Sequence, residues 1–196
     1  MKRFIDVLAS SAGLILLSPL LLALGALVLL TSGAPVLFRQ QRVGRGGHDF
    51  TLLKFRTMTT APGTERGSFD AGRSNRVTPV GRFLRQTKLD ELPQLWNVLA
   101  GHMSLVGPRP EVRKWVQVFP ERWARVLAVR PGITDPASIV YRHEESMLAA
   151  SADPERCYRE EILPHKLDLY EAYVRDQNLA GDLLILGQTL LAVLRR

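Results

Sequence analysis

The sequence predicts an α+β fold that is mostly helical, with a kinked membrane helix, a short β-hairpin and amphipathic interfacial helices around a small cytoplasmic domain. Three observations carry this prediction. Residues 7–30 are almost entirely apolar, residues 35–55 hold two strand-like runs around a glycine-rich loop, and residues 111–129 mix tryptophans and arginines in amphipathic segments. The 196 residues suffice for one domain with a real core.

The charge balance favours anionic partners. The chain has 26 Lys and Arg against 19 Asp and Glu, a formal net charge of +7. This balance predicts attraction to nucleic acid, an anionic membrane leaflet or phosphorylated substrates. Cys157 is the only cysteine, so the chain has no internal disulfide and is compatible with a reducing compartment. We also expect no structural zinc site.

Residues 1–33 are expected to form a membrane anchor that is retained. The apolar run from Val7 to Leu30 reaches the roughly 20 residues needed to cross a bilayer core. A cleaved signal peptide would have a shorter apolar region and a small-residue cleavage site, and Ala34-Pro35 is a poor one. Residues 34–196 are then the predicted domain at the cytoplasmic face.

Charges on both sides of the apolar run indicate its topology. The flanking cationic residues are Lys2, Arg3, Arg39, Arg42 and Arg45. The positive-inside rule draws both groups to the cytoplasmic face. Pro19 kinks a helix and Ser18 can re-satisfy the freed backbone group, so we expect a re-entrant helix that bends at Ser18-Pro19. The alternative is an ordinary spanning helix with a tolerated proline.

Two strand-like runs follow the anchor. The first starts at Pro35 and leads into a basic loop punctuated by glycine at residues 44–47, and residues 50–55 form the second, so we expect a hairpin. Lys54 and Arg56 stand at the end of the second run. By itself such a Lys-x-Arg pair is usually a solvated strand end.

Residues 60–76, rich in small and polar side chains, predict a mobile surface loop that can close over a substrate. A helix that opens at Gly81 then leads to an acidic pair. Arg82 and Arg85 lie three residues apart and therefore on one face of this helix. Helix-surface arginines are mostly solvated, but two that point toward a phosphate-handling site are candidates for substrate contacts.

Asp90 and Glu91 are the candidate reactive residues. Pro93 suits the first turn of a helix, so both carboxylates are expected at a helix N-terminus, where backbone N–H groups and the dipole favour anions. The expected apolar face of this helix is Leu92, Leu95, Trp96 and Leu99. The cations expected nearby are Arg82, Arg85, Lys88 and Arg109. They would hold both carboxylates ionised at neutral pH, as a nucleophile or metal ligand requires. The alternative is the acidic first turn of an ordinary helix.

The rest of the chain predicts further helices. Residues 111–129 suit either the membrane interface, with tryptophan rings at headgroup level, or a core-facing helix with a basic outer face. Residues 154–173 are expected to be partly helical, with Asp153 as the cap. The apolar end, residues 179–196, is expected to be an interfacial helix against the bilayer.

Several segments resemble one known family. They are Lys2-Arg3-Phe4-Ile5-Asp6, the Ser18-Pro19 break, Lys54-Phe55-Arg56-Thr57-Met58, the long run from Thr87 to Pro110 around Asp90-Glu91, and Arg130-Pro131-Gly132-Ile133-Thr134. Together they resemble the bacterial sugar transferases, the small monotopic phosphoglycosyl transferases, over residues 2–134. The run around Asp90 is far more specific than a short motif.

The resemblance implies transfer of a sugar 1-phosphate from a UDP-sugar to a polyprenyl (undecaprenyl) phosphate, with release of UMP and a requirement for Mg²⁺. It implies that Asp90 is the nucleophile of a covalent phosphosugar-aspartate intermediate and that Glu91 holds the magnesium or assists proton balance, with Asp90 as the other candidate metal ligand. The candidate substrate-binding residues are Lys54, Arg56, Arg82, Arg85, Arg109, Pro110 and Arg130.

The same resemblance implies a place in the cell. It implies a monotopic protein of the bacterial inner membrane, with the catalytic domain facing the cytoplasm, that performs the first membrane step of glycoconjugate synthesis. The lipid bilayer is an expected partner, nucleic acid is not, and a homodimer is one option.

The chain departs from the family pattern in three places. Asn75 and His102 stand where the family usually has acidic residues, and Asp135-Pro136-Ala137-Ser138 replaces the usual continuation after Thr134. The last difference indicates a sub-branch with a different sugar pocket. The sequence does not name the sugar.

Other classes of protein stay open at this stage. A membrane-tethered nucleic-acid-binding module would explain the charge. A non-catalytic membrane scaffold would explain the anchor and the basic helices, but it leaves the cluster of Asp90, Glu91 and Arg109 unexplained. An enzyme that transfers the sugar alone would release UDP in place of UMP, so the product nucleotide separates the two reactions.

Overall fold

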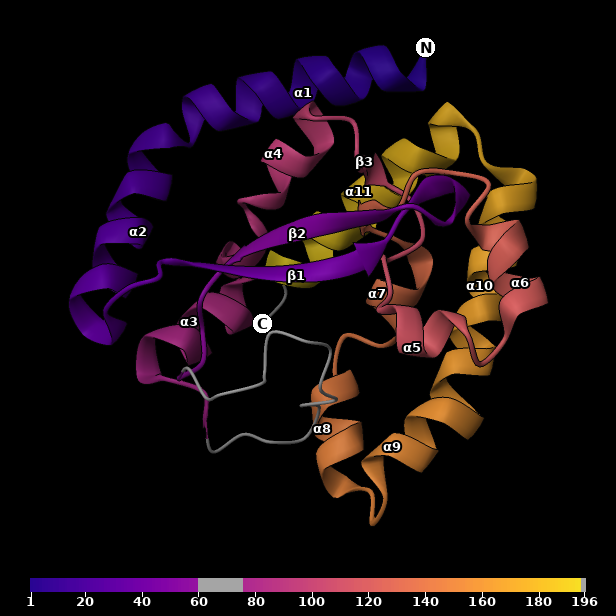
Figure 1. The fold of residues 1–196 in the computed structure, drawn as a ribbon. Helices are drawn as coiled ribbons and strands as arrows, with labels where there is room; N and C mark the ends of the chain where they lie inside the picture. The colour runs from indigo at the N-terminus through magenta and orange to yellow at the C-terminus, as the bar shows by residue number, and fades with distance from the viewer. Residues whose placement is uncertain (60–75, 195–196) are drawn as a thin grey trace.

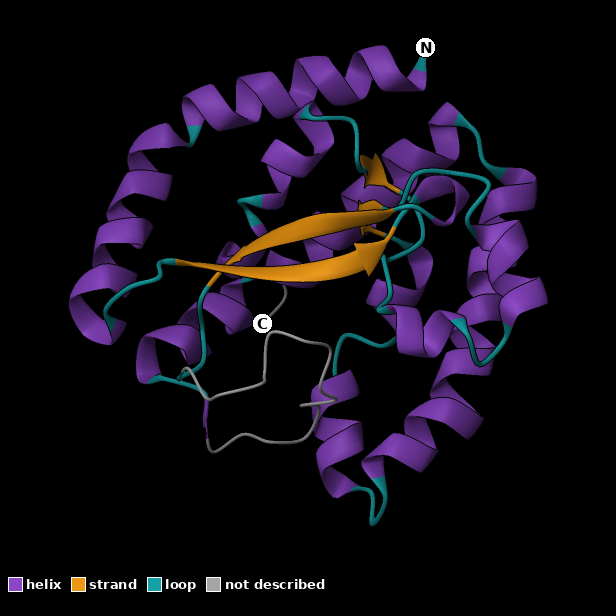
Figure 2. Ribbon diagram, in the orientation of Figure 1, coloured by secondary structure: helices purple, strands orange, loops and turns teal. Residues whose placement is uncertain are grey.

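The structure, a computed structural model, describes residues 1–59 and 76–194 (Figure 1). It is mostly helical, with one antiparallel hairpin and one short parallel strand pair (Figure 2). The predicted α+β class with few strands is therefore confirmed. The predicted loop over residues 60–76 lies, apart from its last residue, outside the described residues.

The N-terminal helices α1 (Lys2–Leu16) and α2 (Ser18–Ser32) meet at a bend of 62°. The bend falls at Leu17, directly before Ser18 and Pro19, so the predicted kink is confirmed. The Ser18 hydroxyl donates to the Ile15 carbonyl over 2.7 Å, the group that an N–H at position 19 would otherwise reach. No single described helix is long and apolar enough to cross a membrane. The two helices of this bent pair meet the criteria of length and composition when they are taken together. Re-entrant insertion stays a prediction.

Polar side chains at the start of α1 bind it to the rest of the protein. Arg3 donates to the carbonyls of Val98 and Leu99 over 2.6 and 2.9 Å. The Asp6 side chain is buried and accepts from the Ser104 hydroxyl over 3.0 Å. These contacts fasten α1 to α4 (Gln94–Leu99) and β3 (Ser104–Val106). Arg3, which was considered above only for its charge, therefore also attaches α1 to α4.

The hairpin pairs β1 (Leu37–Val43) with β2 (Asp49–Phe55) around the short turn η1 (Arg45–Gly47). Leu37 lies opposite Phe55 and Val43 opposite Asp49. The hairpin is confirmed, and its turn falls within the loop predicted at residues 44–47. Val43, buried at the far end of β1, packs in the largest core cluster.

The parallel pair of β3 with β4 (Gly132–Thr134) is a feature that the sequence did not predict. Ser104 pairs with Gly132 and Val106 with Thr134. A Cβ atom on Gly132 would overlap the backbone of Gly107, so glycine is required where these two segments cross. Strands of only three residues give no periodicity that a sequence pattern can reveal.

Tryptophans and tyrosines build the main core under the hairpin. Most of its buried residues lie in α5 (Arg113–Val116), α6 (Pro120–Val126), the π-helical turn η4 (Tyr158–Ile162) and α10 (Leu163–Asp176). The short helix α9 (Pro154–Cys157) adds the partly buried Cys157. Trp115 and Trp123 are both buried in this core. The core-facing interpretation of residues 111–129 is therefore confirmed, and the membrane-interface alternative for these tryptophans is wrong.

The C-terminal part contains three more helices. They are α7 (Pro136–Val140), α8 (Glu144–Ala150) and α11 (Leu179–Leu194). The predicted cap is confirmed, since the Asp153 carboxylate accepts from the Arg156 N–H over 3.0 Å at the start of α9. α11 packs against β3, β4 and α7, with Ile185 buried and Leu183 and Leu184 exposed. Its contact with a bilayer stays a prediction.

Candidate active site

The acidic pair lies in a short 3₁₀ turn between two helices. The helix α3 (Pro79–Thr87) is capped by Thr78, whose hydroxyl accepts from the Gly81 N–H over 2.9 Å. Lys88 follows with φ of 59°, which reverses the chain into the turn η3 (Leu89–Glu91). The next helix begins at Gln94 rather than Pro93. Both carboxylates therefore lie next to the N-terminus of this helix, where they were expected, but in a separate 3₁₀ turn that precedes it.

The face that α4 buries also differs from the prediction. The residues of α4 that are buried are Gln94, Asn97 and Val98. Asn97 explains part of this, because its side chain bonds the β2 backbone, accepting from the Leu53 N–H and donating to the Thr51 carbonyl. Trp96 is instead 57% exposed. The amide pairing with β2 thus decides the orientation of α4 against its apolar pattern.

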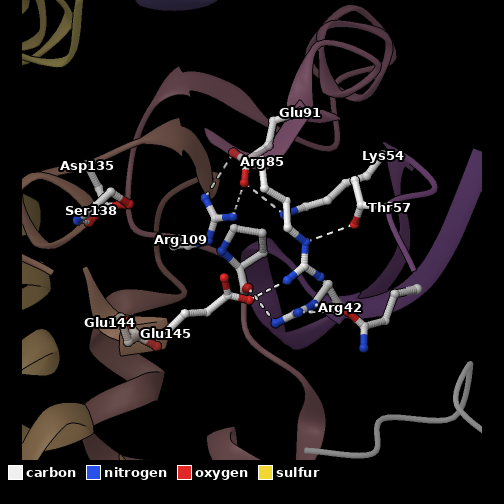
Figure 3. A network of polar contacts seen from close by, with 12 residues as sticks. Arg42, Lys54, Thr57, Arg85, Glu91, Arg109, Asp135, Ser138, Glu144 and Glu145 are labelled. Carbon is white, nitrogen blue, oxygen red and sulfur yellow. Dashed lines mark hydrogen bonds and ion pairs between the residues drawn. The ribbon is translucent and has the colours of Figure 1, made fainter. Parts of the chain in front are cut away.

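Glu91 is the centre of a buried ion cluster (Figure 3). Arg109 donates to both of its carboxylate oxygens, over 2.5 and 3.2 Å, and Lys54 donates to one of them over 2.8 Å. Burial by itself would raise the pKa of Glu91, but Arg109 and Lys54 outweigh it and hold that pKa well below its usual range. The same carboxylate raises the pKa of Arg109. Glu91 is therefore ionised at neutral pH, as predicted.

Asp90 has a different environment from its neighbour. Its side chain is only 6% exposed, and Oδ1 is buried without a hydrogen-bond partner among the described residues. Burial raises its pKa, and Lys54, Lys88 and Arg85 oppose that effect only in part. Burial thus outweighs the cations for Asp90, whereas the cations together outweigh burial for Glu91. That Asp90 is ionised at neutral pH stays a prediction. An unsatisfied buried oxygen is costly, so its presence at the edge of a cavity indicates a function.

The cavity beside Asp90 has a volume of about 1290 Å³ and is lined by many cations. The basic residues that line it are Arg42, Lys54, Arg56, Arg76, Arg82, Arg85, Lys88, Arg109, Arg142 and Lys166. Acidic residues balance part of this charge on the opposite walls, Glu144 and Glu145 among them. A concave, cationic site of this size suits a ligand that carries several phosphate charges.

Four of the predicted substrate-binding residues other than Lys54 and Arg109 lie at the cavity. Arg82 is exposed on its wall, and its side chain makes no hydrogen bond with the part of the chain that the structure describes. Arg85 donates to the Thr57 hydroxyl over 2.9 Å and pairs with Glu145. The carbonyl of Pro110 accepts from Arg42 over 3.1 Å. The fourth, Arg56, is engaged elsewhere.

The Arg56 guanidinium closes the carboxyl end of α2. It donates to the carbonyls of Ser32, Gly33 and Ala34, so its donors are largely occupied by the anchor. Arg130 donates to the Gly101 carbonyl over 2.9 Å and does not line the cavity. The structure thus gives Arg56 and Arg130 structural contacts where substrate contacts were expected.

A polar wall that sequence reasoning missed continues from Arg109. Glu111 pairs with Arg42 over 2.9 Å and accepts from the Tyr158 hydroxyl over 2.6 Å. Lys166, buried beside the Tyr158 ring, pairs with Glu144 over 2.9 Å. Glu111 directly follows the Arg109-Pro110 pair in the sequence, which was the only local signal for this wall. Its other members come from distant helices, so no spacing in the sequence predicts that they lie together.

The divergent stretch after Thr134 lines the same cavity. Asp135 caps α7, and its carboxylate accepts from the Ser138 N–H over 2.9 Å and from the Ser138 hydroxyl. Burial raises the pKa of Asp135 although Ser138 and the nearby Arg109 oppose it. Thr134, Ala137 and Ser138 all face the cavity. Of the other two departures, His102 lies outside the cavity and stacks on Phe50, and Asn75 lies outside the described residues.

The side chains around the acidic turn offer few ligands for the expected magnesium ion. Within residues 1–59 and 76–194 no three carboxylate, histidine or cysteine side chains come together as metal ligands. Mg²⁺ often takes one or two carboxylates and completes its shell with water and substrate phosphates. The unpartnered oxygen of Asp90 fits this arrangement. Glu91 fits less well, because both of its oxygens already accept from cations.

Comparison with known proteins gives consistent matches. The sequence profile described as "Bacterial sugar transferase" matches residues 1–196. The UDP-N-acetylgalactosamine-undecaprenyl-phosphate N-acetylgalactosaminephosphotransferase of Aeromonas hydrophila is 39% identical over 196 residues, covering 98% of this chain and 43% of that protein. The exopolysaccharide production protein ExoY of Rhizobium meliloti is 35% identical, covering 98% of this chain and 84% of that protein.

A third relative covers less of the chain. The UDP-glucose:undecaprenyl-phosphate glucose-1-phosphate transferase of Klebsiella pneumoniae is 44% identical over 145 residues, covering 70% of this chain and 30% of that protein. The chain thus spans less than half the length of the Aeromonas and Klebsiella relatives.

Proposed function

This chain belongs to the bacterial sugar transferase family, and on that basis we propose that it transfers a sugar 1-phosphate from a UDP-sugar to polyprenyl phosphate, releasing UMP. The observation that carries the proposal is the buried, unpartnered oxygen of Asp90 at the edge of a cation-lined cavity. A carboxylate kept free of hydrogen bonds among so many positive charges is suited to attack an anionic phosphorus centre.

In the first step, an Asp90 oxygen attacks the sugar-linked phosphorus of the donor. The new O–P bond forms as the bond from that phosphorus to the bridging oxygen breaks, and UMP leaves with the electron pair. In the second step, a phosphate oxygen of the lipid acceptor attacks the same phosphorus and the bond to Asp90 breaks. The products are a polyprenyl diphosphosugar and a regenerated carboxylate, so atoms and charge balance.

The chain's own residues neutralise charge during these steps. Arg82 and Lys88 line the cavity and are exposed to an incoming phosphate, so they can bind the donor directly. Glu91 keeps Lys54 and Arg109 fixed beside the acidic turn. Asp90, with Glu91 adjacent, would hold Mg²⁺, which supplies further charge stabilisation to phosphate oxygens when bound.

The raised pKa of Asp90 also serves this reaction. A carboxylate of higher pKa is a stronger base, and its lack of hydrogen bonds leaves its electron pair available. The site must be reached first by a water-soluble donor and then by a lipid. The cavity must therefore lie at the level of the lipid headgroups. We propose that α1 and α2 enter one leaflet of the bacterial inner membrane and return, which holds the domain at the cytoplasmic face.

The test is nucleotide release by the full chain in detergent with undecaprenyl phosphate, Mg²⁺ and a panel of UDP-sugars. The wild type is expected to release UMP with at least one donor, and Asp90→Asn is expected to release none. Asp49→Asn is the matched control, because Asp49 is an exposed surface carboxylate paired with Arg113. Release of UDP, or full activity of Asp90→Asn, would overturn the covalent mechanism.

A second readout separates chemistry from lipid binding. Exchange of labelled UMP into the UDP-sugar without lipid reports the first step alone. A covalent aspartyl intermediate predicts exchange in the wild type and in Asp49→Asn, and none in Asp90→Asn. A reaction in which lipid phosphate attacks the donor directly predicts no exchange without lipid in any of the three.

A further inference from the structure

The cavity has an apolar side as well as a cationic side. The apolar residues that line it include Leu92, Leu95, Leu105, Ile133, Ile139, Leu186, Leu190 and Ala192. Leu105 and Ile133 lie in the two paired strands, each between the same two register pairs, so they form one floor. β3 contacts both α4 and α11. The lining is therefore a continuous groove between α4 and α11.

Both rims of this groove are apolar and exposed. On α4, Leu95 lines the groove and the next residue, Trp96, is largely exposed. On α11, Leu186 and Leu190 line the groove, and Leu190 is also 65% exposed. Large exposed apolar side chains beside a concave apolar surface mark a site for an apolar ligand or a lipid surface.

The groove joins the reactive site directly. Leu92 lines the groove and follows Glu91 by one residue in the chain. The cavity therefore offers many cations around the acidic turn, and mainly aliphatic contact with Thr134 and Thr189 beside β4 and α11. A ligand that matches it has an anionic head and a long hydrocarbon tail. Of the two substrates in the proposed reaction, only the polyprenyl phosphate has that form.

We propose that the groove between α4 and α11, floored by Leu105 and Ile133 and walled by Leu186 and Leu190, holds the isoprenoid chain of the lipid acceptor. This inference rests on the proposed function. The charge pattern favours this occupant over a second copy of the chain, because a protein surface would not require the cationic end. The lipid phosphate then lies toward Asp90 while the chain leaves along α11.

The experiment places tryptophan at three positions of α11 in the full chain. Leu190→Trp fills the groove from an exposed position and therefore should not disturb folding, and Leu186→Trp fills it from a half-buried one. Leu184→Trp is the matched control, because Leu184 is 63% exposed and does not line the cavity. Each variant is assayed for KM with undecaprenyl phosphate and with geranyl phosphate, and for exchange of labelled UMP without lipid.

Both groove variants are expected to raise KM for undecaprenyl phosphate by about tenfold, the change that about 1.4 kcal/mol produces. They should leave KM for geranyl phosphate and the UMP exchange unchanged, and Leu184→Trp should change none of these values. Unchanged KM for undecaprenyl phosphate in Leu190→Trp, or an equal rise for both acceptors, overturns the inference. A changed oligomeric state with unchanged KM values overturns it in favour of a second copy.

The exchange assay separates this inference from the proposed function. If the wild type shows no exchange and releases no UMP, the proposed function fails and the inference falls with it. If the wild type shows UMP exchange but the groove variants leave KM for undecaprenyl phosphate unchanged, the proposed function stands and the assignment of the groove is wrong.

Discussion

Replacing Glu91 by glutamine tests whether the buried ion cluster holds the reactive turn in place. The change keeps the shape of the side chain but removes the charge that faces Arg109 and Lys54. The Glu91 side chain is 11% exposed, and those of Lys54 and Arg109 are 20% and 30% exposed. Two cations would then be left close together and mostly buried, without their shared anion.

The expected loss of stability is large. Removing one partner of a buried ion pair typically costs about 3–5 kcal/mol. For a chain of this size each kcal/mol lowers Tm by about 2–4 °C, so Glu91→Gln should melt about 6–20 °C below the wild type. The assay is thermal unfolding in detergent. Glu145→Gln is the matched control, because its carboxylate pairs with Arg85 at 66% exposure and a surface pair is worth about 0–1 kcal/mol.

The same cluster predicts how the stability of the Glu91→Gln variant, relative to the wild type, depends on pH and on a bound ligand. The folded-state pKa of Glu91 lies well below its unfolded value of about 4.3, so its contribution is complete above that value and is lost as pH falls toward the folded pKa. The difference in Tm between wild type and variant should therefore shrink only below about pH 4.3. UDP should stabilise Glu91→Gln more than the wild type, since its phosphates can pair with the released cations. A variant that melts with the wild type at neutral pH would refute this account of the cluster.

Two further predictions follow from the structure. Because burial raises the pKa of Asp90, the acid limb of the pH profile for UMP exchange should lie above about 3.9, the ordinary Asp value, and activity should fall as pH drops through it; an acid limb at or below that value would contradict the burial argument. Gly81→Ala should lower Tm strongly, because its Cβ would overlap the Thr57 carbonyl group where α3 meets the end of β2, whereas Gly187→Ala, with open space around its Cβ, should be neutral or stabilising by up to about 1 kcal/mol; thermal unfolding of the two variants side by side checks the contrast.

Features that depend on neighbouring residues were predictable from the sequence. The kink needs only Pro19 and the hydroxyl of Ser18, and the cap needs only Asp153 before its helix. The hairpin follows from two strand-like runs separated by a short glycine-rich turn. In each case the physical cause lies within a few residues of its effect, so the local pattern contains the answer.

Features that depend on distant partners were not predictable. Trp96 and Trp115 have similar amphipathic surroundings in the sequence, yet one is exposed and the other buried. Asn97 decides the first case through β2, and the second follows from packing against Tyr158. The opposite pKa shifts of Asp90 and its neighbour have the same origin. Adjacent residues share every local signal, but only Glu91 pairs directly with Lys54 and Arg109, which together outweigh burial.

The contacts of Arg56 show how the anchor and the reactive site are mechanically joined. Its guanidinium holds the carbonyls at the end of α2, while Lys54, two residues earlier in the chain, pairs with Glu91. Thr57, which directly follows Arg56, accepts a hydrogen bond from Arg85 on α3 through its hydroxyl. One short segment thus fixes the end of the anchor, the acidic turn and a cavity arginine in a single arrangement. If α2 lies in a membrane as proposed, its depth sets the depth of Asp90, so the place where a soluble donor meets a lipid phosphate is determined by the fold itself.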